Sequence, residues 1–303
     1  MSTAPQIAVT PTVIRNILFT TDFSAASARA LPYALSIARQ HGATVHVAHV
    51  IKPTKTFIDL ETGIPLDITE AEARNEAWKH MDALLLPQLI NGVNCTSTVR
   101  EGGLWECVSR LISQYGIDLL ILGTKGAGGL TKMVLGSGAE ELFHEVPCPV
   151  MTIGPHVGAS GNGQFKEILF ALDFTDQSMH AYPYALEFAT ESHGRLTVLH
   201  VVLPIPAEFA GDCAMTEYKE MMLSLAIKEV RKATDFARHP VRPQVIVDCG
   251  NPPKTIVQYS REIPADLIVM GVKHRTRFAA HIPWTVTHEV VSHASCPVLT
   301  VRS

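Results

Sequence analysis

Short apolar runs alternate with amphipathic stretches along the whole chain. The runs are rich in branched residues and predict buried strands, which in the first half cover 14–20, 44–51, 93–100, 118–123 and 149–153. Between the runs, apolar residues recur at helical spacing, as Leu31, Ala34, Leu35 and Ala38 do. Strands joined by helices predict a parallel sheet with right-handed crossovers and helices on both of its faces.

Local signals mark where the predicted helices begin. Ser24 is suited to cap the helix after the first strand. Pro32 and Pro183 stand at matching places in the two halves, and an interior proline costs about 3 kcal/mol, so we expect a kink or a late start at both. Thr69 and Glu72 form a capping box. The helix that they open has a predicted buried stripe including Trp78, Met81 and Leu85, and further helices are expected at 104–114 and 137–145.

The sequence of the first half recurs in the second half. Residues 14–35 align with 165–186 at an offset of 151 residues, and Asp118-Leu119 recurs as Asp266-Leu267. The period is that of a domain rather than of a solenoid repeat. A small, polar segment rich in glycine lies between the halves and reads as a flexible linker. We therefore predict one domain at 1–154, a linker at 155–164 and a second domain at 165–303.

Composition excludes several classes of protein. A net charge of −4 and a pI near 6.4 argue against nucleic acid as the main partner. No apolar stretch approaches the roughly 18 residues of a membrane helix, and no secretory signal is visible at the N-terminus. The six cysteines are scattered without a C-x-x-C pair, which indicates reduced thiols and a cytoplasmic protein. Cys107, Cys148 and Cys296 are expected to be buried.

Candidate binding residues follow two of the predicted strands in the first half. Asp22 comes just after strand one, and the glycine-rich loop from Gly123 to Gly136 comes just after strand four. Ligands of parallel sheets bind beyond the carboxyl ends of strands, where the strand order reverses. Ser137 and Glu140 form a capping box for the next helix, whose N-terminus and free loop amides would attract an anion. Lys125 and Lys132 could add positive charge.

Glycines alone leave another interpretation open, because Gly126, Gly128 and Gly129 also suit a flexible surface loop. The loop is not a Walker A motif, since no Gly-Lys-Ser or Gly-Lys-Thr follows the glycines. It also differs from the G-x-G-x-x-G that opens a helix directly after strand one of dinucleotide-binding folds. The position of the loop beside Asp22, at neighbouring strand-to-helix junctions, favours an anion site.

Taken together, these residues resemble the universal stress protein family. ATP-binding members of that family carry G-x2-G-x9-G followed by Ser or Thr, and this chain matches the motif at Gly123, Gly126, Gly136 and Ser137. The segments Thr21-Asp22-Phe23-Ser24, His49-Val50 and 146–153 also match. The resemblance extends over both halves, so the chain resembles a tandem universal stress protein.

The resemblance implies two Rossmann-like domains of the adenine nucleotide alpha hydrolase type, each with a five-stranded sheet of order 3-2-1-4-5 and flanking helices. ATP would lie across the ends of strands one and four, with Asp22 on the adenine or ribose side, Val50 against the adenine and Leu122 at its edge. The implied ATP-binding residues are Thr20, Thr21, Asp22, Val50, Leu122, Gly123, Lys125, Gly126, Gly128, Gly129, Gly136, Ser137 and Gly138. A Mg²⁺ or Mn²⁺ ion bridging the phosphates is expected because it lowers the charge density of the triphosphate, and no protein ligand is assigned to it.

The second half departs from this motif. His274 and Trp284 stand where the first half has Gly126 and Gly136, and His288 replaces Glu140. A Trp side chain at a phosphate-facing position would occupy ligand volume, so we expect no ATP in the second domain. The cluster Lys273, His274, Arg275 and Arg277 either binds another anion or is a solvated basic loop. The histidines His274, His281, His288 and His293 fit no metal-binding spacing.

The last strand of each half is expected to be an open sheet edge, and such edges invite pairing with another strand. In dimers of the family the final strands of two subunits pair antiparallel. Residues 150–153 and 298–301 are therefore expected to pair within this chain as a pseudo-dimer, and a homodimer of such chains is a further expectation.

Three functions remain open. The first is a stress-response regulator that binds ATP in its N-terminal domain, hydrolyses it slowly or not at all, and changes its contacts with a regulatory protein partner. The second is an ATP hydrolase or phosphotransferase that uses Lys125, Ser137 or a histidine. The third is an interaction scaffold without nucleotide. Asp22 is assigned to the wrong end of the nucleotide to activate water at the γ-phosphate, which favours the regulator.

Overall fold

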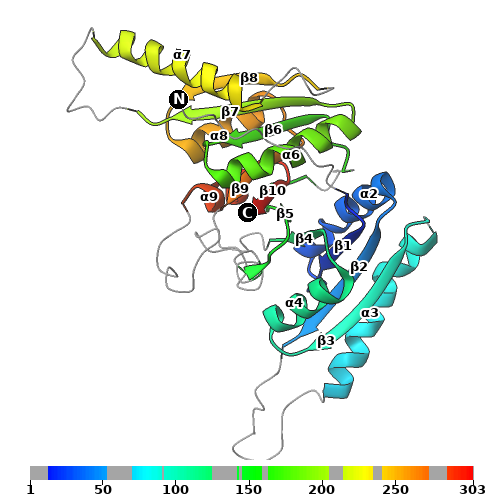
Figure 1. Ribbon diagram of the computed structural model, residues 1–303. Coiled ribbons are helices and arrows are strands. Elements are labelled where there is room, and N and C mark those ends of the chain that lie inside the picture. The colour runs from blue at the N-terminus through cyan, green and yellow to red at the C-terminus, as the bar shows by residue number, and fades with distance from the viewer. Residues whose placement is uncertain are drawn as a thin grey trace, which may run out of the picture. The chain divides into compact units, whose positions relative to one another are not determined.

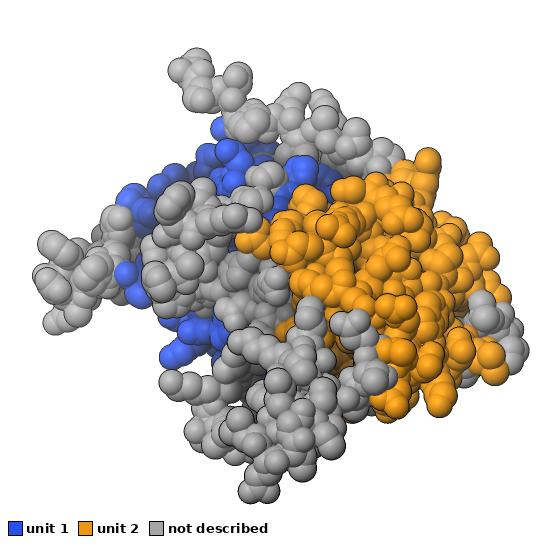
Figure 2. Space-filling view, turned by 90° about the horizontal axis from the view of Figure 1, so that it is seen from below, with its two compact units in different colours: residues 1–12, 126–134, 149–303 blue, residues 13–125, 135–148 orange. Residues whose placement is uncertain are grey.

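The structure is a computed structural model, and it describes residues 13–52, 70–90, 92–124, 142, 145–158, 163–204, 214–234, 241–272 and 285–302. The chain divides into two compact units, which Figure 2 colours separately. The first unit along the chain, orange in Figure 2, contains the described residues of 13–124 and 142–148, and the second, blue in Figure 2, contains those of 149–302. Each unit is built around its own parallel strands.

The first unit has four parallel strands in the order β3-β2-β1-β4. The strands are β1 (Asn16–Thr20), β2 (Thr44–Ile51), β3 (Cys95–Glu101) and β4 (Leu119–Gly123). The helices are α1 (Ala25–Ala28), α2 (Leu31–His41), α3 (Glu70–Ile90) and α4 (Leu104–Tyr115). Thr20 at the end of β1 is in register with Ala48 of β2 and with Leu122 of β4. The carboxyl ends of these three strands therefore meet at one edge.

The second unit repeats this arrangement and adds two strands, β5 and β10 (Figure 1). Its strands are β5 (Val150–Ile153), β6 (Glu167–Leu172), β7 (Arg195–Val202), β8 (Gln244–Cys249), β9 (Leu267–Val272) and β10 (Val298–Arg302). The parallel strands run in the order β8-β7-β6-β9-β10, and β5 pairs antiparallel with β10, the pairing expected from the two open edges. The helices are α6 (Asp176–Glu191), α7 (Ala214–Thr234), α8 (Pro252–Glu262) and α9 (Thr285–His293).

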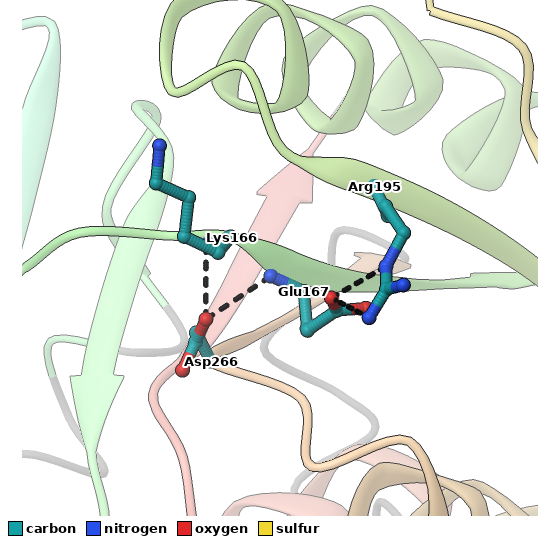
Figure 3. Close-up of polar contacts among 4 residues, drawn as sticks. All are labelled: Lys166, Glu167, Arg195 and Asp266. Atoms are coloured by element: carbon teal, nitrogen blue, oxygen red, sulfur yellow. Dashed lines mark hydrogen bonds and ion pairs between the residues drawn. The ribbon is translucent and has the colours of Figure 1, made fainter.

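The recurring Asp-Leu pair joins the starts of two strands in each unit. Asp266 Oδ2 accepts hydrogen bonds from the backbone amides of Lys166 and Glu167, at 2.9 and 3.0 Å (Figure 3). Asp118 Oδ2 does the same for the amides of Arg15 and Asn16, at 2.8 and 2.9 Å. The aspartate thus satisfies amides at the start of the central strand, which explains its presence in both halves.

The strands form the core of each unit, as their continuous apolar runs predict. Most residues of β1, β4, β6 and β9 are buried. Cys107, Cys148 and Cys296 are buried as expected. Burial raises the pKa of the Cys296 thiol to about 12, so it is an unreactive core residue.

One predicted core position is wrong. Trp78 is 37% exposed, whereas Ala77, Met81 and Leu85 of the same helix are buried. Ala77, Met81 and Leu85 follow each other at intervals of four residues, so they lie on one face of the helix, and that face is the buried one. Trp78 comes one residue after Ala77 and therefore lies to the side of that face. The expected capping box at Thr69 lies outside the described residues.

The helix signals are confirmed in part. The Ser24 side chain accepts a hydrogen bond from the Ser27 amide and caps α1. Pro32 lies in the first turn of α2, the expected late start, where its missing N–H leaves no bond unmade. The late start is wrong for Pro183, which lies inside the continuous α6. There the Met179 carbonyl loses its amide partner instead.

None of the described helices combines the length and the apolar composition that a membrane span requires.

Candidate functional site

The structure brings together the predicted site residues that it describes in the first unit. Thr20 ends β1 and is followed by Thr21 and Asp22, Val50 lies next to the end of β2, and Leu122 and Gly123 end the neighbouring β4. The chain leaves β1 toward β2 on one side and reaches β4 on the other, so the strand order reverses between β1 and β4. Lys125, Gly126, Gly128, Gly129, Gly136, Ser137 and Gly138 lie outside the described residues.

A network of hydrogen bonds fixes the turn that follows β1. Thr21 Oγ1 accepts from the Phe23 amide at 2.9 Å and bonds Ser27 Oγ at 3.0 Å. The Thr21 amide donates to the Ala48 carbonyl at 3.0 Å, and the Thr21 carbonyl lies 2.8 Å from His49 Nδ1. A carbonyl only accepts, so the proton of this contact sits on His49 Nδ1.

This turn holds Phe23 in a left-handed backbone conformation, with φ at 58°. Such a conformation is unusual for a bulky residue and persists only where neighbouring groups hold it. The Phe23 ring lies against His49, with centroids 4.4 Å apart, and against His80 of α3 at 5.2 Å. The turn directs Asp22 outward, where its side chain is exposed.

Asp22 is a carboxylate held in its charged form. Partial burial acts to raise the pKa of its carboxyl, but hydrogen bonds from Ser24 and Ser27 outweigh burial and hold that pKa below its usual range. The Ser24 amide donates to Asp22 Oδ1 at 3.0 Å. The site therefore presents a fixed, exposed acceptor at the end of β1.

Packing alone requires glycine at position 123. A Cβ there would lie 2.3 Å from the Ala26 carbonyl oxygen and 2.8 Å from Ser27 Cα, because α1 crosses the end of β4. Gly271 meets the same constraint in the second unit, where a Cβ would lie 2.3 Å from the Ser178 amide nitrogen of α6. This explains why Gly271 remains although the later glycines of the motif are replaced.

The second unit keeps the framework of the turn. Phe174 has φ at 60° and its ring lies 4.7 Å from that of His200, whose Nδ1 is 2.8 Å from the Leu172 carbonyl oxygen. Asp173 Oδ1 accepts from the Thr175 amide at 3.0 Å and from its hydroxyl at 2.6 Å. His49 and His200 thus make the same hydrogen bond in the two turns, each to the carbonyl of the residue before the aspartate.

Two details differ between the turns. Leu172 replaces Thr21, so the hydroxyl that bonds the Phe23 amide and Ser27 has no counterpart. The Asp173 amide donates to Ser178 Oγ at 3.4 Å, whereas the equivalent Ser27 Oγ bonds Thr21 Oγ1. Among the described residues, the two turns share a backbone shape but not the same polar surface.

Sequence reasoning missed the supporting roles of Ser27, Phe23 and His80. The recurrence of Phe23 as Phe174 was a visible signal for the turn. Nothing in the sequence placed His80 beside Phe23, because the two are joined only through the packing of α3. Within the described parts of the chain, no three His, Cys, Asp or Glu side chains gather in the way that a metal site requires. The four histidines around the second loop are only partly described.

Known proteins with similar sequences point to one family. A model of the universal stress protein family matches residues 14–154 and again residues 164–302. The chain is 25% identical over 300 residues to a universal stress protein of Mycolicibacterium smegmatis, covering 94% of this chain and 96% of the relative. It is 32% identical over 138 residues to a universal stress protein of Thermus aquaticus, which covers 46% of this chain and 99% of the relative.

Solved structures agree at the level of the fold. The crystal structure of a universal stress protein from Archaeoglobus fulgidus is similar with a TM-score of 0.66 at 20% identity, and the match covers 95% of this chain and 98% of that one. A putative universal stress protein from Pseudomonas aeruginosa gives a TM-score of 0.64 at 18% identity. Both matches extend over the two repeats.

Proposed function

The chain belongs to the universal stress protein family, and we propose that it is a stress-response regulator that binds ATP in its N-terminal domain. The observation that carries the proposal is that β1, β2 and β4 end at one edge of the sheet, where Asp22 follows β1 and Val50 and Leu122 lie next to the ends of β2 and β4. A charged acceptor at the same edge as apolar residues suits a purine nucleoside, which offers hydrogen-bond donors at the edge of a flat apolar ring.

In this proposal the two ends of the nucleotide have different partners. Asp22 accepts hydrogen bonds from the adenine or the ribose, while Val50 and Leu122 pack against the base. The G-x2-G-x9-G-S sequence supplies the phosphate side, and Mg²⁺ or Mn²⁺ bridges the phosphates. The proposed phosphate-side residues are Lys125, Gly126, Gly128, Gly129, Gly136, Ser137 and Gly138, and Thr20, Thr21 and Gly123 complete the strand ends.

We propose that hydrolysis is slow or absent. A general base works best when its pKa is near the working pH, and the hydrogen bonds to Asp22 lower the pKa of that carboxyl. Asp22 is thus a weak base, and the proposal places it at the nucleoside end of ATP. Binding instead changes the contacts that the N-terminal domain makes with a regulatory protein partner.

Nucleotide analysis of the purified full-length protein tests the proposal. Nucleotide released by denaturation is identified, and turnover of labelled ATP is then followed with Mg²⁺ or Mn²⁺ present. Bound, unhydrolysed ATP supports the regulator. Steady phosphate release supports the alternative, a hydrolase or phosphotransferase. Absence of binding supports a nucleotide-free scaffold and overturns the proposal.

Four further features belong to the same proposal. Each domain has the sheet order 3-2-1-4-5, with 150–153 as the last strand of the first domain. The second domain binds no ATP, because its sequence has Trp284 in place of a glycine. The chain forms a homodimer, which analytical ultracentrifugation would test. It works in the cytoplasm, which is supported by the free thiols of the cysteines that the structure describes.

A further inference from the structure

The second unit contains an open polar groove at the amino ends of its strands, whereas Asp173 lies beyond their carboxyl ends. The groove has a volume of about 770 Å³, within the range of small-ligand sites. The starts of β6 and β7 and the residues around the start of β8 contribute to it, together with the residues that follow α6 and end α8. Its polar lining includes Glu167, His193, Arg195, Thr197, Arg242 and Glu262.

The first unit has a stack of two rings at the equivalent position. His46 stacks on Tyr115 with centroids 4.2 Å apart, and its ring nitrogens lie 2.8 Å from Thr96 Oγ1 and 3.2 Å from Asn16 Oδ1. The repeat replaces His46 with Thr197, Tyr115 with Ile263 and Asn16 with Glu167. The second repeat thus has Thr197 and Ile263 along its groove where the first has two stacked rings.

One guanidinium of the groove is already paired. Arg195 Nε donates to Glu167 Oε1 at 2.6 Å, and its Nη2 contacts the same oxygen (Figure 3). The Arg195 side chain is nevertheless 82% exposed. A guanidinium has five N–H donors in a planar fork, and Glu167 engages only one edge of that fork. The remaining donors are accessible to a ligand.

Arg242 supplies the second guanidinium of the groove, and no described carboxylate pairs with it. Arg242 makes no ion pair or hydrogen bond with any other described residue. Thr197 of β7 and Gln244 of β8 are in register. Arg195 and Arg242 each stand two residues before them, so the two arginines lie at neighbouring strand starts. Two like charges at neighbouring strand starts repel each other, and an oxyanion between them removes that cost through charge-assisted hydrogen bonds.

We propose that this groove binds a small organic anion whose carboxylate or phosphate group is held by Arg195 and Arg242. The apolar lining by Val241 and Ile263 packs against the carbon skeleton of the ligand. Glu262 selects ligands that carry a hydroxyl or ammonium group, because its carboxylate is exposed and, among the described residues, accepts a hydrogen bond only from the Gln258 side-chain amide, at 2.8 Å. The site does not depend on ATP binding in the first domain.

Titration of the ¹⁵N-labelled full chain tests this site, with succinate and inorganic phosphate as separate probes. Either probe is expected to shift the backbone amide signals of Arg195, Thr197 and Gln244 in a saturable way. Succinate alone would identify a carboxylate ligand, phosphate alone a phosphate ester, and both a general oxyanion site. Absence of shifts at these amides with both probes overturns the proposal.

Matched variants separate the groove from general charge effects. Arg242→Gln is expected to weaken binding about tenfold, the value of one charge-assisted hydrogen bond. Arg242→Lys keeps the positive charge but lacks the planar fork of donors, so its affinity should lie between that of the parent and that of Arg242→Gln. Arg231→Gln removes an exposed charge from α7, outside the groove, and should leave affinity unchanged. Equal weakening by Arg231→Gln and Arg242→Gln would contradict a built site, and ATP binding in all three variants should equal that of the parent.

Discussion

Met151 of β5 lies directly opposite Leu299 of β10, and the two occupy the same position in their respective repeats. On either side Val150 faces Thr300, and Thr152 faces Val298. Equivalent segments thus pair antiparallel about a local pseudo-two-fold axis, as in an isologous interface between subunits. The duplication has placed both copies of this edge in one chain, where each satisfies the other.

The hydrogen bonds at this pairing break the symmetry, which gives a first prediction. Thr300 Oγ1 donates to the Val150 carbonyl at 3.2 Å, whereas the buried Thr152 Oγ1 has no partner among the described residues. Thr300→Val should cost about 1 kcal/mol, because it removes a made hydrogen bond. Thr152→Val should be neutral or stabilising. Urea unfolding of both variants measures this, and equal destabilisation by the two would contradict it.

A second prediction concerns the glycines that end β4 and β9. Gly123→Ala and Gly271→Ala should each destabilise the protein by about 2 kcal/mol, because the new methyl overlaps helix backbone that cannot move aside. Unfolding is measured without nucleotide. Gly92→Ala is the control: it has open space around it and φ at 74°, so it should cost only about 1 kcal/mol of backbone strain. A Gly123→Ala variant with full stability would show that packing does not require this glycine.

A third prediction follows from the buried His46, which stacks on Tyr115 in the first unit. Burial lowers the pKa of His46, so the unfolded chain binds more protons than the native state once the pH falls below the ordinary histidine pKa of about 6.5. The contribution of neutral His46 is therefore fully present above that pH and decreases as the pH falls toward the lower native pKa. The free energy of unfolding should decrease less between pH 7.5 and 5.5 in His46→Gln than in the parent.

The exposed His156 provides the control for that experiment. His156→Gln removes an exposed imidazole ring without disturbing the stack on Tyr115. Its stability should follow the same pH dependence as the parent, and an unchanged dependence in His46→Gln would contradict the third prediction.

A fourth prediction addresses the phosphate side of the proposed nucleotide site. Gly126→Trp and Gly136→Trp should abolish ATP binding while the fold survives, because each introduces a bulky ring at a position proposed to face the phosphates. Calorimetric titration with ATP and circular dichroism measure the two effects. Native affinity in either folded variant would refute the assignment of these glycines.

A fifth prediction addresses the nucleoside side. Asp22→Asn keeps an oxygen that can accept from the Ser24 amide, so the turn should remain, but the loss of the charge should weaken ATP binding about tenfold. Asp173→Asn makes the same change in the second repeat and should leave ATP affinity unaltered. A reversed result would place the nucleotide in the second domain.

The sequence by itself determined the local elements and their repetition. Apolar periodicity placed β1, β2 and β4, the Ser24 hydroxyl capped α1, and the recurring Asp-Leu pair marked equivalent strand starts. These features depend on residues close together in the chain, or on repetition that is visible without knowing any distance.

Only the tertiary structure decided which distant residues meet. It assigned Gly123 and Gly271 to helix packing, exposed Trp78, placed His80 beside Phe23, and left a groove where the repeat lost the stack of His46 on Tyr115. Each depends on strand register and on how a helix crosses a sheet, which are set by the packing of the whole core. Residue spacing along the chain carries no record of those contacts.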